Sequence, residues 1–342
     1  MDVILKYLPA DINLSNPSHV GLIALAGLGL FYVTGPLRSL LRMFMSAFIL
    51  PGKSLKSMAP TGSWALVTGA SDGIGAEFSK QLAAKGYNVL LVSRTASKLD
   101  DVAASIKSAY PNISTAVFAM DFAADRDADY AALKRLIDER DVGILVNNVG
   151  LSHDIPAKFV DTPEHEMRGI ITVNCMATLR VTALVAPGMA QRRRGLILTM
   201  GSFAGSVTPV PLLATYSGSK AFLTSWSVAL SAELAPSNVH VQLVESYLVV
   251  SSMSKVRRAS VAIPTPKQLV RSTLSHVGRS GGAGSFGGGA VGTPYWAHAV
   301  GEWAIRNITG VDRPWFLRWN MGVHENIRKS ALRKAERQRK GQ

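Results

Sequence analysis

Short apolar runs alternate along the middle of the chain with segments whose apolar residues recur every three or four positions. The runs at 64–67, 89–92 and 142–146 carry no charge and are typical of strands buried on both faces of a parallel sheet. The segments at 96–109 and 127–140 have helical periodicity. This alternation predicts an α/β fold with a doubly wound parallel sheet, which binds its ligands at the carboxyl ends of the strands.

The N-terminal part has a different pattern. Residues Val20–Val33 are apolar or glycine, and a second apolar run covers Met43–Leu50. Because about 20 apolar residues cross a bilayer, we predict one membrane-anchoring helix near His19–Leu37, followed by an interfacial segment near Leu40–Leu50. A helical hairpin or an amphipathic anchor on the membrane surface is the alternative. Basic residues follow the predicted span at Arg38, Arg42, Lys53 and Lys56. By the positive-inside rule, they place the main domain in the cytosol.

The first apolar run leads into a turn that carries Gly69, Gly73 and Gly75, and a helical pattern follows. Strand, glycine turn and helix form the geometry that places a diphosphate at a helix N-terminus. Arg94 follows the next strand, 19 residues beyond Gly75 (94 − 75). An arginine at this place accommodates a ribose 2′-phosphate, whereas a carboxylate binds a 2′-hydroxyl, so the sequence favours NADPH over NADH. Asp121 ends the third strand, where it meets an adenine ring or, alternatively, caps the following segment.

Tyr216 and Lys220 lie four residues apart in the helical run Ala214–Leu234 and therefore on one helix face. A tyrosine has a reference pKa of about 10, and a nearby ammonium lowers that pKa. We therefore expect Lys220 to tune Tyr216 for proton transfer at a carbonyl oxygen. Ser202 follows the fifth predicted strand and can hydrogen-bond the same oxygen, and Asn174 can help to hold a water beside Lys220.

Other chemistry fits the sequence less well. Ser202 lacks the Gly-x-Ser-x-Gly surroundings of a hydrolase nucleophile. The seven histidines show no metal-ligand spacing, so we predict no metal site, and the single Cys175 excludes an internal disulfide. The net charge of +14 is compatible with nucleic acid, anionic lipid or an anionic substrate. Nucleic-acid binding lacks interleaved aromatic residues and a known module, so we predict no nucleic-acid partner.

The C-terminal part carries three further features. Residues 279–292 are glycine-rich and predict a flexible loop, which is either an acyl-chain lid or an unimportant insertion. A helical face with Trp296, Val300 and Trp303 is predicted to line an acyl tunnel or to touch the bilayer. The basic end at 327–340 is either a solvated helix or a contact for anionic lipid headgroups.

These motifs resemble the short-chain dehydrogenase/reductase family over residues 62–245. Thr68–Gly75 matches its Thr-Gly-x-x-x-Gly-x-Gly turn, and Asn147–Gly150 resembles its Asn-Asn-Ala-Gly motif, with valine in place of alanine. The resemblance implies a Rossmann-type sheet, with Tyr216 as proton donor and Lys220 on the nicotinamide ribose. The implied catalytic residues are Tyr216, Lys220, Ser202 and Asn174. The implied NADPH contacts are Thr68, Gly69, Ser71, Gly73, Ile74, Gly75, Arg94, Asp121, Asn148, Tyr216, Lys220 and Val249.

After the sixth predicted strand, many family members carry Pro-Gly, but this chain has Glu245-Ser246 at the start of the stretch 245–255. That stretch, Pro264–Lys267 and Thr293–Ala299 resemble the fungal microsomal very-long-chain 3-oxoacyl-CoA reductases. This resemblance implies reduction of 3-oxoacyl-CoA to 3-hydroxyacyl-CoA, the second step of fatty-acid elongation, at the endoplasmic reticulum membrane. The implied partners are membrane lipids and the other elongase subunits, namely the condensing enzyme, dehydratase and enoyl reductase. A ketoreductase for steroid 17-ketones or 3-ketosphingoid bases and a non-catalytic lipid-binding scaffold are the alternatives. The expected organisation is an anchor and linker at 1–58, an NADPH-binding reductase domain at 59–260, and a helical substrate- and membrane-proximal extension with a basic tail at 261–342.

Overall fold

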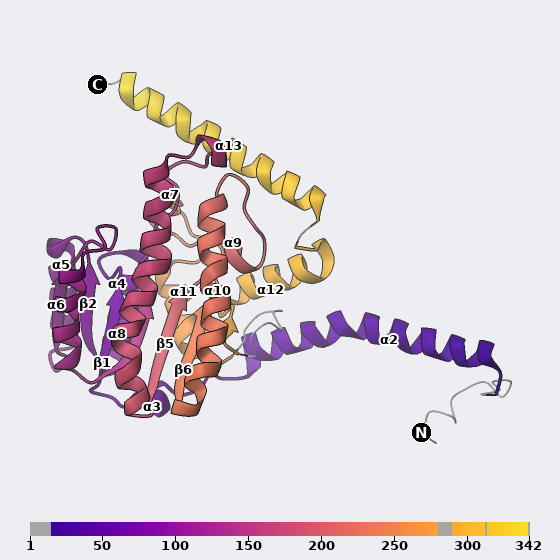
Figure 1. The fold of residues 1–342 in the computed structure, drawn as a ribbon, viewed down its shortest axis with the longest axis horizontal. Helices are drawn as coiled ribbons and strands as arrows, with labels where there is room; N and C mark the ends of the chain where they lie inside the picture. Colours follow the sequence, from indigo (N-terminus) through magenta and orange to yellow (C-terminus); the bar gives the residue numbers. More distant parts are fainter. Residues whose placement is uncertain (1–14, 280–288, 312, 341–342) are drawn as a thin grey trace.

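The computed structural model describes residues 15–279, 289–311 and 313–340, and within them one parallel sheet forms the centre of the molecule (Figure 1). The order of its strands is β3-β2-β1-β4-β5-β6-β7. Their bounds are β1 (Trp64–Thr68), β2 (Asn88–Ser93), β3 (Thr115–Ala119), β4 (Val142–Asn147), β5 (Gly195–Met200), β6 (Val239–Val244) and β7 (Val291–Gly292). The strand order switches direction between β1 and β4, and doubly wound sheets bind their ligands at the carboxyl ends of the strands at such a switch point. The α/β prediction is confirmed.

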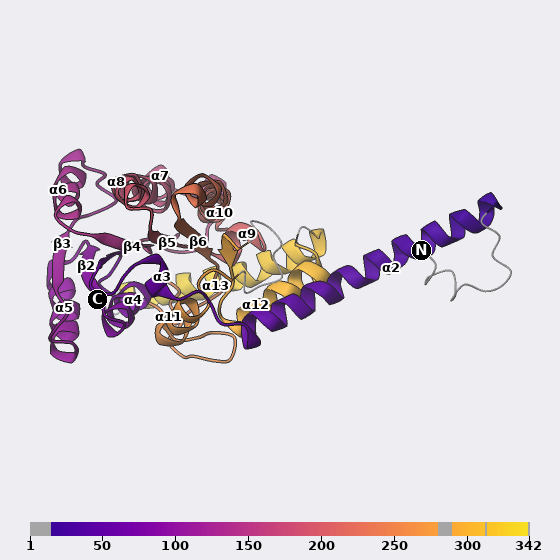
Figure 2. The same ribbon diagram turned by 90° about the horizontal axis from the view of Figure 1, so that it is seen from below.

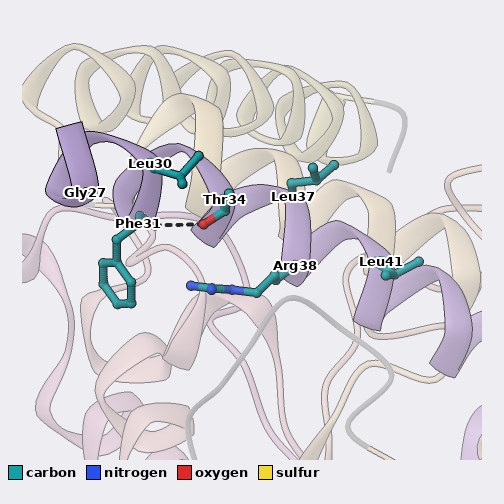
Figure 3. A pocket seen from close by; sticks show the side chains of 7 residues that line it. All are labelled: Gly27, Leu30, Phe31, Thr34, Leu37, Arg38 and Leu41. Carbon is teal, nitrogen blue, oxygen red and sulfur yellow. Dashed lines mark hydrogen bonds between the residues drawn. The ribbon is translucent and has the colours of Figure 1, made fainter. Parts of the chain in front are cut away.

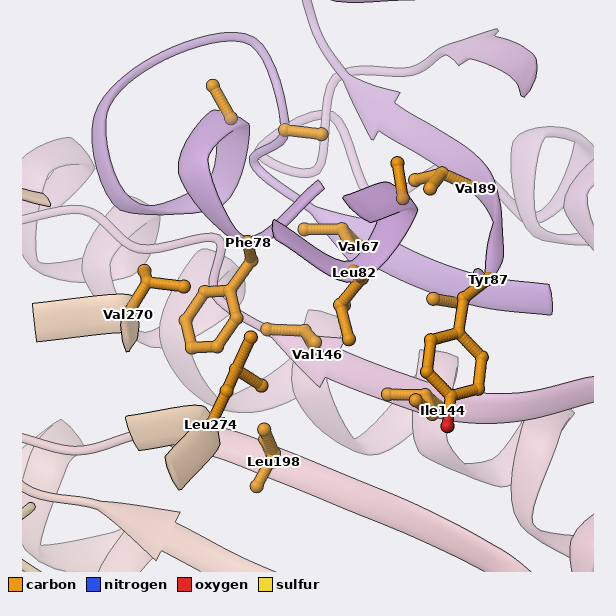
Figure 4. Packing of buried hydrophobic residues seen from close by; sticks show 14 of the residues in the cluster. Val67, Phe78, Leu82, Tyr87, Val89, Ile144, Val146, Leu198, Val270 and Leu274 are labelled. Atoms are coloured by element: carbon orange, nitrogen blue, oxygen red, sulfur yellow. The ribbon is translucent and has the colours of Figure 1, made fainter. Parts of the chain in front are cut away.

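Helices cover both faces of the sheet (Figure 2). One face carries α4 (Gly73–Ala84), α5 (Ala96–Ala109) and α11 (Pro266–Ser275). The other carries α6 (Asp127–Asp138), α8 (Ala177–Gln191) and α10 (Ala214–Leu234). On the first face, Phe78 and Leu82 of α4 pack with Val146, Leu198 and Leu274 (Figure 4). Burial of side chains such as these contributes about 1.5–3 kcal/mol each, which fixes α4 directly behind the glycine turn.

The N-terminal segment is one long helix. Helix α2 (Pro17–Phe44) begins at Asn16, whose side chain accepts a hydrogen bond from Ser18 N, and it continues into η1 (Met45–Ile49). Together they form a 33-residue helix that is long and apolar enough to cross a membrane, and the most apolar part of it is not buried in the protein. The predicted segment Leu40–Leu50 is not separated from the predicted span, because the chain continues through Pro36 as a helix. Its interfacial location stays a prediction.

A second helix, of 28 residues from Glu164 to Gln191, is also long and apolar enough to cross a membrane but has a different setting. It consists of α7 (Glu164–Ile171), the π-turn η3 (Thr172–Met176) and α8. More than half of its apolar window is buried, since α8 packs against the sheet, so we interpret it as a core helix.

The C-terminal part is integrated with the sheet. Most of the predicted glycine-rich loop, at 280–288, lies outside the described residues, but its end forms β7 and pairs with β6. The chain continues through α12 (Trp296–Ala304), η5 (Ile305–Thr309) and α13 (Pro314–Lys340). Helix α13 lies across loops at the carboxyl end of the sheet, where Asn320 Nδ2 donates to Pro209 O at 3.3 Å and Arg328 donates to Pro156 O at 2.6 Å.

Candidate active site

The turn between β1 and α4 depends on its glycines. Gly69 and Gly73 have φ angles of +65° and +55°, in the left-handed region that side chains rarely adopt. A Cβ atom on Gly75 would lie 2.2 Å from Gly69 O, so only glycine permits this close approach of helix and strand. The Asp72 carboxylate accepts a hydrogen bond from Gly73 N at 2.6 Å and caps α4. The backbone therefore forms an open cradle at a helix N-terminus.

Thr68 and Asn148 connect the carboxyl ends of β1 and β4 beside this cradle. Thr68 Oγ1 accepts hydrogen bonds from Asn148 N at 3.0 Å and Val149 N at 3.1 Å. Asn148 Nδ2 donates to Thr68 O at 3.0 Å and to Gly69 O at 3.2 Å. Both side chains thus bond to the protein itself, and they shape the turn rather than project from it.

The other predicted cofactor residues surround the same edge. The Ser71 and Ser93 hydroxyl oxygens lie 2.9 Å apart and join the turn to the end of β2, after which Arg94 is exposed. Ile74 packs at the margin of the core. Asp121 Oδ1 accepts a hydrogen bond from Ala123 N at 3.0 Å within the turn after β3. It does not cap the next helix, because α6 has Arg126 as its N-cap.

The loop after β6 covers the cradle. Val249 is buried, Ser252 Oγ donates to Asp72 Oδ2 at 3.1 Å, and the Ser251 Cβ lies next to Gly73. This loop takes the place in which the family carries Pro-Gly. It therefore forms one wall of the site.

His298 of α12 holds that loop from outside. Its Nδ1 accepts a hydrogen bond from Tyr247 N at 3.3 Å, and its Nε2–H donates to Ala262 O at 3.1 Å. Burial lowers the pKa of His298 to about 4, so the ring is neutral near pH 7. Tyr295 adds a hydrogen bond from its hydroxyl to Val261 O at 3.0 Å. Sequence reasoning missed this support, although the motif Thr293–Ala299 had marked the segment.

Tyr216, Lys220 and Ser202 meet at the end of β5. Lys220 is buried and its Nζ donates to Met200 O at 2.8 Å, with Nζ 5.9 Å from the centre of the Tyr216 ring. Burial lowers the pKa of Lys220 to about 8. Burial also raises the pKa of Tyr216, whereas a side-chain hydrogen bond with Ser202 lowers it. Lys220 was expected to lower the pKa of Tyr216. In the structure, burial and the hydrogen bond with Ser202 are instead the causes of the shift in this pKa.

Asn174 lies in the π-turn η3 and is fully buried. Its Oδ1 accepts from Leu151 N at 2.7 Å, while its Nδ2 donates to Leu151 O and to Ser219 Oγ, both at 2.9 Å. Ser219 Oγ in turn donates to Tyr216 O at 2.7 Å. Asn174 therefore connects the loop after β4 with the helix turn of Tyr216, and π-turns of this kind are frequent at functional sites.

A buried acidic pair adjoins the site. Glu245, directly after β6, and Glu302, on α12, are almost completely inaccessible to solvent. Glu302 Oε1 pairs with Arg306 Nε at 2.8 Å, and its Oε2 accepts from Thr293 Oγ1 at 2.6 Å. Burial and the neighbouring Glu302 raise the pKa of Glu245 to about 8, against smaller lowering effects of Ser206 and Arg306. Glu245 is therefore a protonated acid near pH 7.

A separate hollow lies on α2 (Figure 3). The Arg38 guanidinium carbon is 5.3 Å from the Phe31 ring centre at this hollow, and Thr34 Oγ1 donates to Phe31 O at 3.3 Å. Its lining residues are Gly27, Leu30, Phe31, Thr34, Leu37, Arg38 and Leu41. Because all of them belong to one helix, this hollow is a feature of the helix surface and not the cofactor cradle.

Comparison with known proteins agrees with this geometry. The family model for short chain dehydrogenase matches residues 63–262. Very-long-chain 3-oxoacyl-CoA reductase of Coccidioides immitis is 60% identical over 310 residues, which cover 91% of this chain and 88% of the relative. The protein of the same name from Aspergillus niger is 52% identical over 344 residues, 99% of either chain.

Solved structures have the same architecture. The short-chain dehydrogenase from Sphingobium yanoikuyae in complex with NADPH is 30% identical, with a TM-score of 0.56 over 62% of this chain and 83% of that one. The bulky-bulky ketone specific alcohol dehydrogenase from Comamonas testosteroni is 28% identical, with a TM-score of 0.56 over 62% and 81%. With its glycine turn, its Tyr216–Lys220 pair and these matches, the chain belongs to the short-chain dehydrogenase family.

Proposed function

We propose that the protein is an NADPH-dependent reductase of very-long-chain 3-oxoacyl-CoA, which it converts to 3-hydroxyacyl-CoA in the second step of fatty-acid elongation. The observation that carries the proposal is the contact of Ser202 with Tyr216 above the buried Lys220, next to a cradle for a dinucleotide. The names of relatives that align with nearly the whole chain support the substrate class.

The residues present fit NADPH. Gly69 and Gly75 let the turn pack tightly against Asn148 and its own backbone, whereas a Cβ on Gly73 would meet only Ser251 at 3.9 Å. This compact turn stands at the helix N-terminus where a diphosphate binds. Arg94 is exposed at the strand end where a 2′-phosphate is bound. We assign Val249 to the nicotinamide side of the cradle. When bound, NADPH supplies the hydride for the reaction.

The chain itself supplies the proton and the orientation. The hydroxyl groups of Ser202 and Tyr216 both reach the carbonyl oxygen of the 3-oxo group, and Tyr216 donates its proton to that oxygen as the carbonyl carbon is reduced. The Lys220 ammonium stabilises the phenolate that remains. Asn174 positions Tyr216 through Ser219. The carbonyl gains one hydride and one proton and becomes the 3-hydroxyl group.

Helix α2 supports a membrane location. We propose that it crosses the endoplasmic reticulum membrane and that Arg38 and Arg42 keep the sheet domain on the cytosolic side. The condensing enzyme, dehydratase and enoyl reductase of elongation are the proposed protein partners, because they supply and consume the acyl-CoA.

The test measures NADPH oxidation by the detergent-solubilised full chain with a long-chain 3-oxoacyl-CoA, a 17-ketosteroid and a 3-ketosphingoid base. We expect preference for the acyl-CoA. Loss of the proton donor in Tyr216→Phe should reduce turnover by about 10²–10⁴-fold while NADPH still binds, and Tyr110→Phe at the end of α5 is the matched control. Undiminished turnover by Tyr216→Phe would refute the mechanism. Turnover of another ketone alone would remove the elongation role, and NADPH binding without any turnover would favour a scaffold.

A further inference from the structure

We propose that Ile308, Trp315 and Trp319 form a collar that inserts into the interfacial layer of the bilayer that α2 crosses, from the headgroups into the outer part of the hydrocarbon core. The inference rests on the proposed membrane anchoring by α2 and adds a second, independent membrane contact. These side chains are 73%, 55% and 60% exposed. A collar of this kind would fix the orientation of the sheet domain on the membrane.

Helix α12 packs antiparallel to the C-terminal part of α2. The Phe48 and Trp296 rings lie 6.1 Å apart, and Ala299 packs in one cluster with Met43 and Ala47. At the other end of α12, Trp303 Nε1 donates to Pro36 O at 3.4 Å. The contacts on α2 therefore move towards its N-terminus as α12 proceeds towards its C-terminus. They extend as far as Pro36.

The length of α2 fixes the level of the bilayer. Residues 17–37 precede Arg38 and, at about 1.5 Å per residue, span about 31 Å, which matches the thickness of about 30 Å of a hydrocarbon core. The edge of that core therefore lies close to Leu37, at the level of Trp303. Ile308 follows five residues later, so it extends up to about 7 Å further in the direction of the membrane.

Helix α13 starts on the same side. Its first turn lies beside the end of α12, on the side of the sheet domain from which α2 projects, and the rest of α13 leads away from that side (Figures 1 and 2). Trp315 and Trp319 are four residues apart on this first part and share one face. Arg313 and Arg318 are exposed beside them.

This combination fits a lipid interface. Tryptophan is enriched where hydrocarbon meets headgroups, and arginine is attracted to anionic headgroup phosphates. The lipid contact expected at the basic end of the chain is thus proposed for the beginning of α13 instead. An apolar face that lay away from α2 and carried no cations would indicate a protein partner. The face of Trp315 and Trp319 has arginines beside it and adjoins the membrane-spanning helix.

Site-specific quenching can test the collar. The only cysteine, Cys175, is buried, so single cysteines at Ile308, Trp319, Leu25 and Tyr110 can be labelled with bimane in the full chain. The variants Ile308→Cys, Trp319→Cys, Leu25→Cys and Tyr110→Cys are reconstituted in vesicles of phosphatidylcholine and phosphatidylinositol that contain a nitroxide-labelled lipid. The unsubstituted chain reports labelling of Cys175, and NADPH binding reports an intact fold.

We expect lipid nitroxide to quench bimane at Ile308 and Trp319 to an extent comparable with Leu25 inside the span. The label at Tyr110, at the opposite edge of the sheet, should remain unquenched. Quenching at Leu25 without quenching at Ile308 and Trp319 would overturn the collar and leave the anchor intact. No quenching at any of these three positions would overturn the collar together with the membrane anchor.

Discussion

Replacing Glu245 with glutamine should abolish a loss of stability that the native protein suffers as pH rises. Glu245 is buried at the end of β6 beside Glu302, and Arg306 already pairs with Glu302. Within the described part of the chain Glu245 forms no ion pair, and its carboxyl group stays protonated in the fold until about pH 8. Glutamine has nearly the same shape but cannot ionise.

The sign and size follow from proton linkage. Below about pH 4.5, the Glu245 carboxyl is protonated in the folded and unfolded chains alike and does not affect the free energy of unfolding. Between that pH and about 8, only the unfolded chain releases the proton, so the free energy of unfolding falls as pH rises. A pKa raised from 4.5 to about 8, at about 1.4 kcal/mol per unit, amounts to about 5 kcal/mol. This is an upper limit, because Glu302 shares the titration.

The assay compares thermal unfolding of the detergent-solubilised full chain, native and Glu245→Gln, from pH 5 to pH 8. Other titrating groups are common to both proteins and cancel in the difference. We expect the melting temperature of Glu245→Gln to exceed that of the native chain by an amount that grows with pH. Glu233→Gln, at an exposed position of α10, is the matched control and should follow the native curve. Parallel curves for Glu245→Gln and the native chain would refute the buried-acid interpretation.

Three further outcomes follow from the site. Gly75→Ala should lose NADPH binding as measured by fluorescence titration, because its Cβ would lie 2.2 Å from Gly69 O, and unaltered affinity would contradict the cradle. His298→Ala removes two hydrogen bonds of the loop over the cradle, which together contribute about 2 kcal/mol, and should raise the KM for NADPH by about 30-fold. The control His276→Ala should leave this KM unchanged. Equal KM values for His298→Ala and the native chain would refute the positioning role of His298. Arg94→Ala should weaken NADPH but not NADH in steady-state kinetics, and an equal effect on both would exclude a 2′-phosphate contact.

Local patterns predicted most of the sheet domain correctly. The bounds of α5 and α10 are those expected, and the apolar runs at 64–67, 89–92 and 142–146 fall within β1, β2 and β4, because fully apolar strands and long periodic helices carry their own signal. Strand β7 was missed, since two residues at the end of a glycine-rich stretch adopt strand geometry only through pairing with β6. Helix α13 begins well before the predicted basic helix, because its first turns are stabilised by contacts such as that of Asn320 with Pro209.

The predicted site residues also fall into two groups. Some are determined by local sequence, and others by contacts between distant parts of the chain. Tyr216 and Lys220 were found from the spacing of one helix face. Asn174 was expected beside Lys220, but in the structure its amide bonds to Leu151 and Ser219, partners that only the folded chain brings together. The π-turn that carries this buried amide interrupts an apolar pattern which looks continuous in sequence.

The loop after β6 shows how the C-terminal part supports the site. The proline of Pro-Gly restricts the backbone through its own fixed φ, and therefore requires no partner. Glu245 and Ser246 have no such limits, and here α12 supplies the restraint through His298, which accepts a hydrogen bond from Tyr247 N and donates one to Ala262 O. Helix α12 also packs on the C-terminal end of α2 and on η1. The helix that restrains the loop after β6 therefore adjoins α2, the proposed membrane anchor. Substitutions in α12 should accordingly alter NADPH affinity even though α12 contributes no residue to the proton transfer.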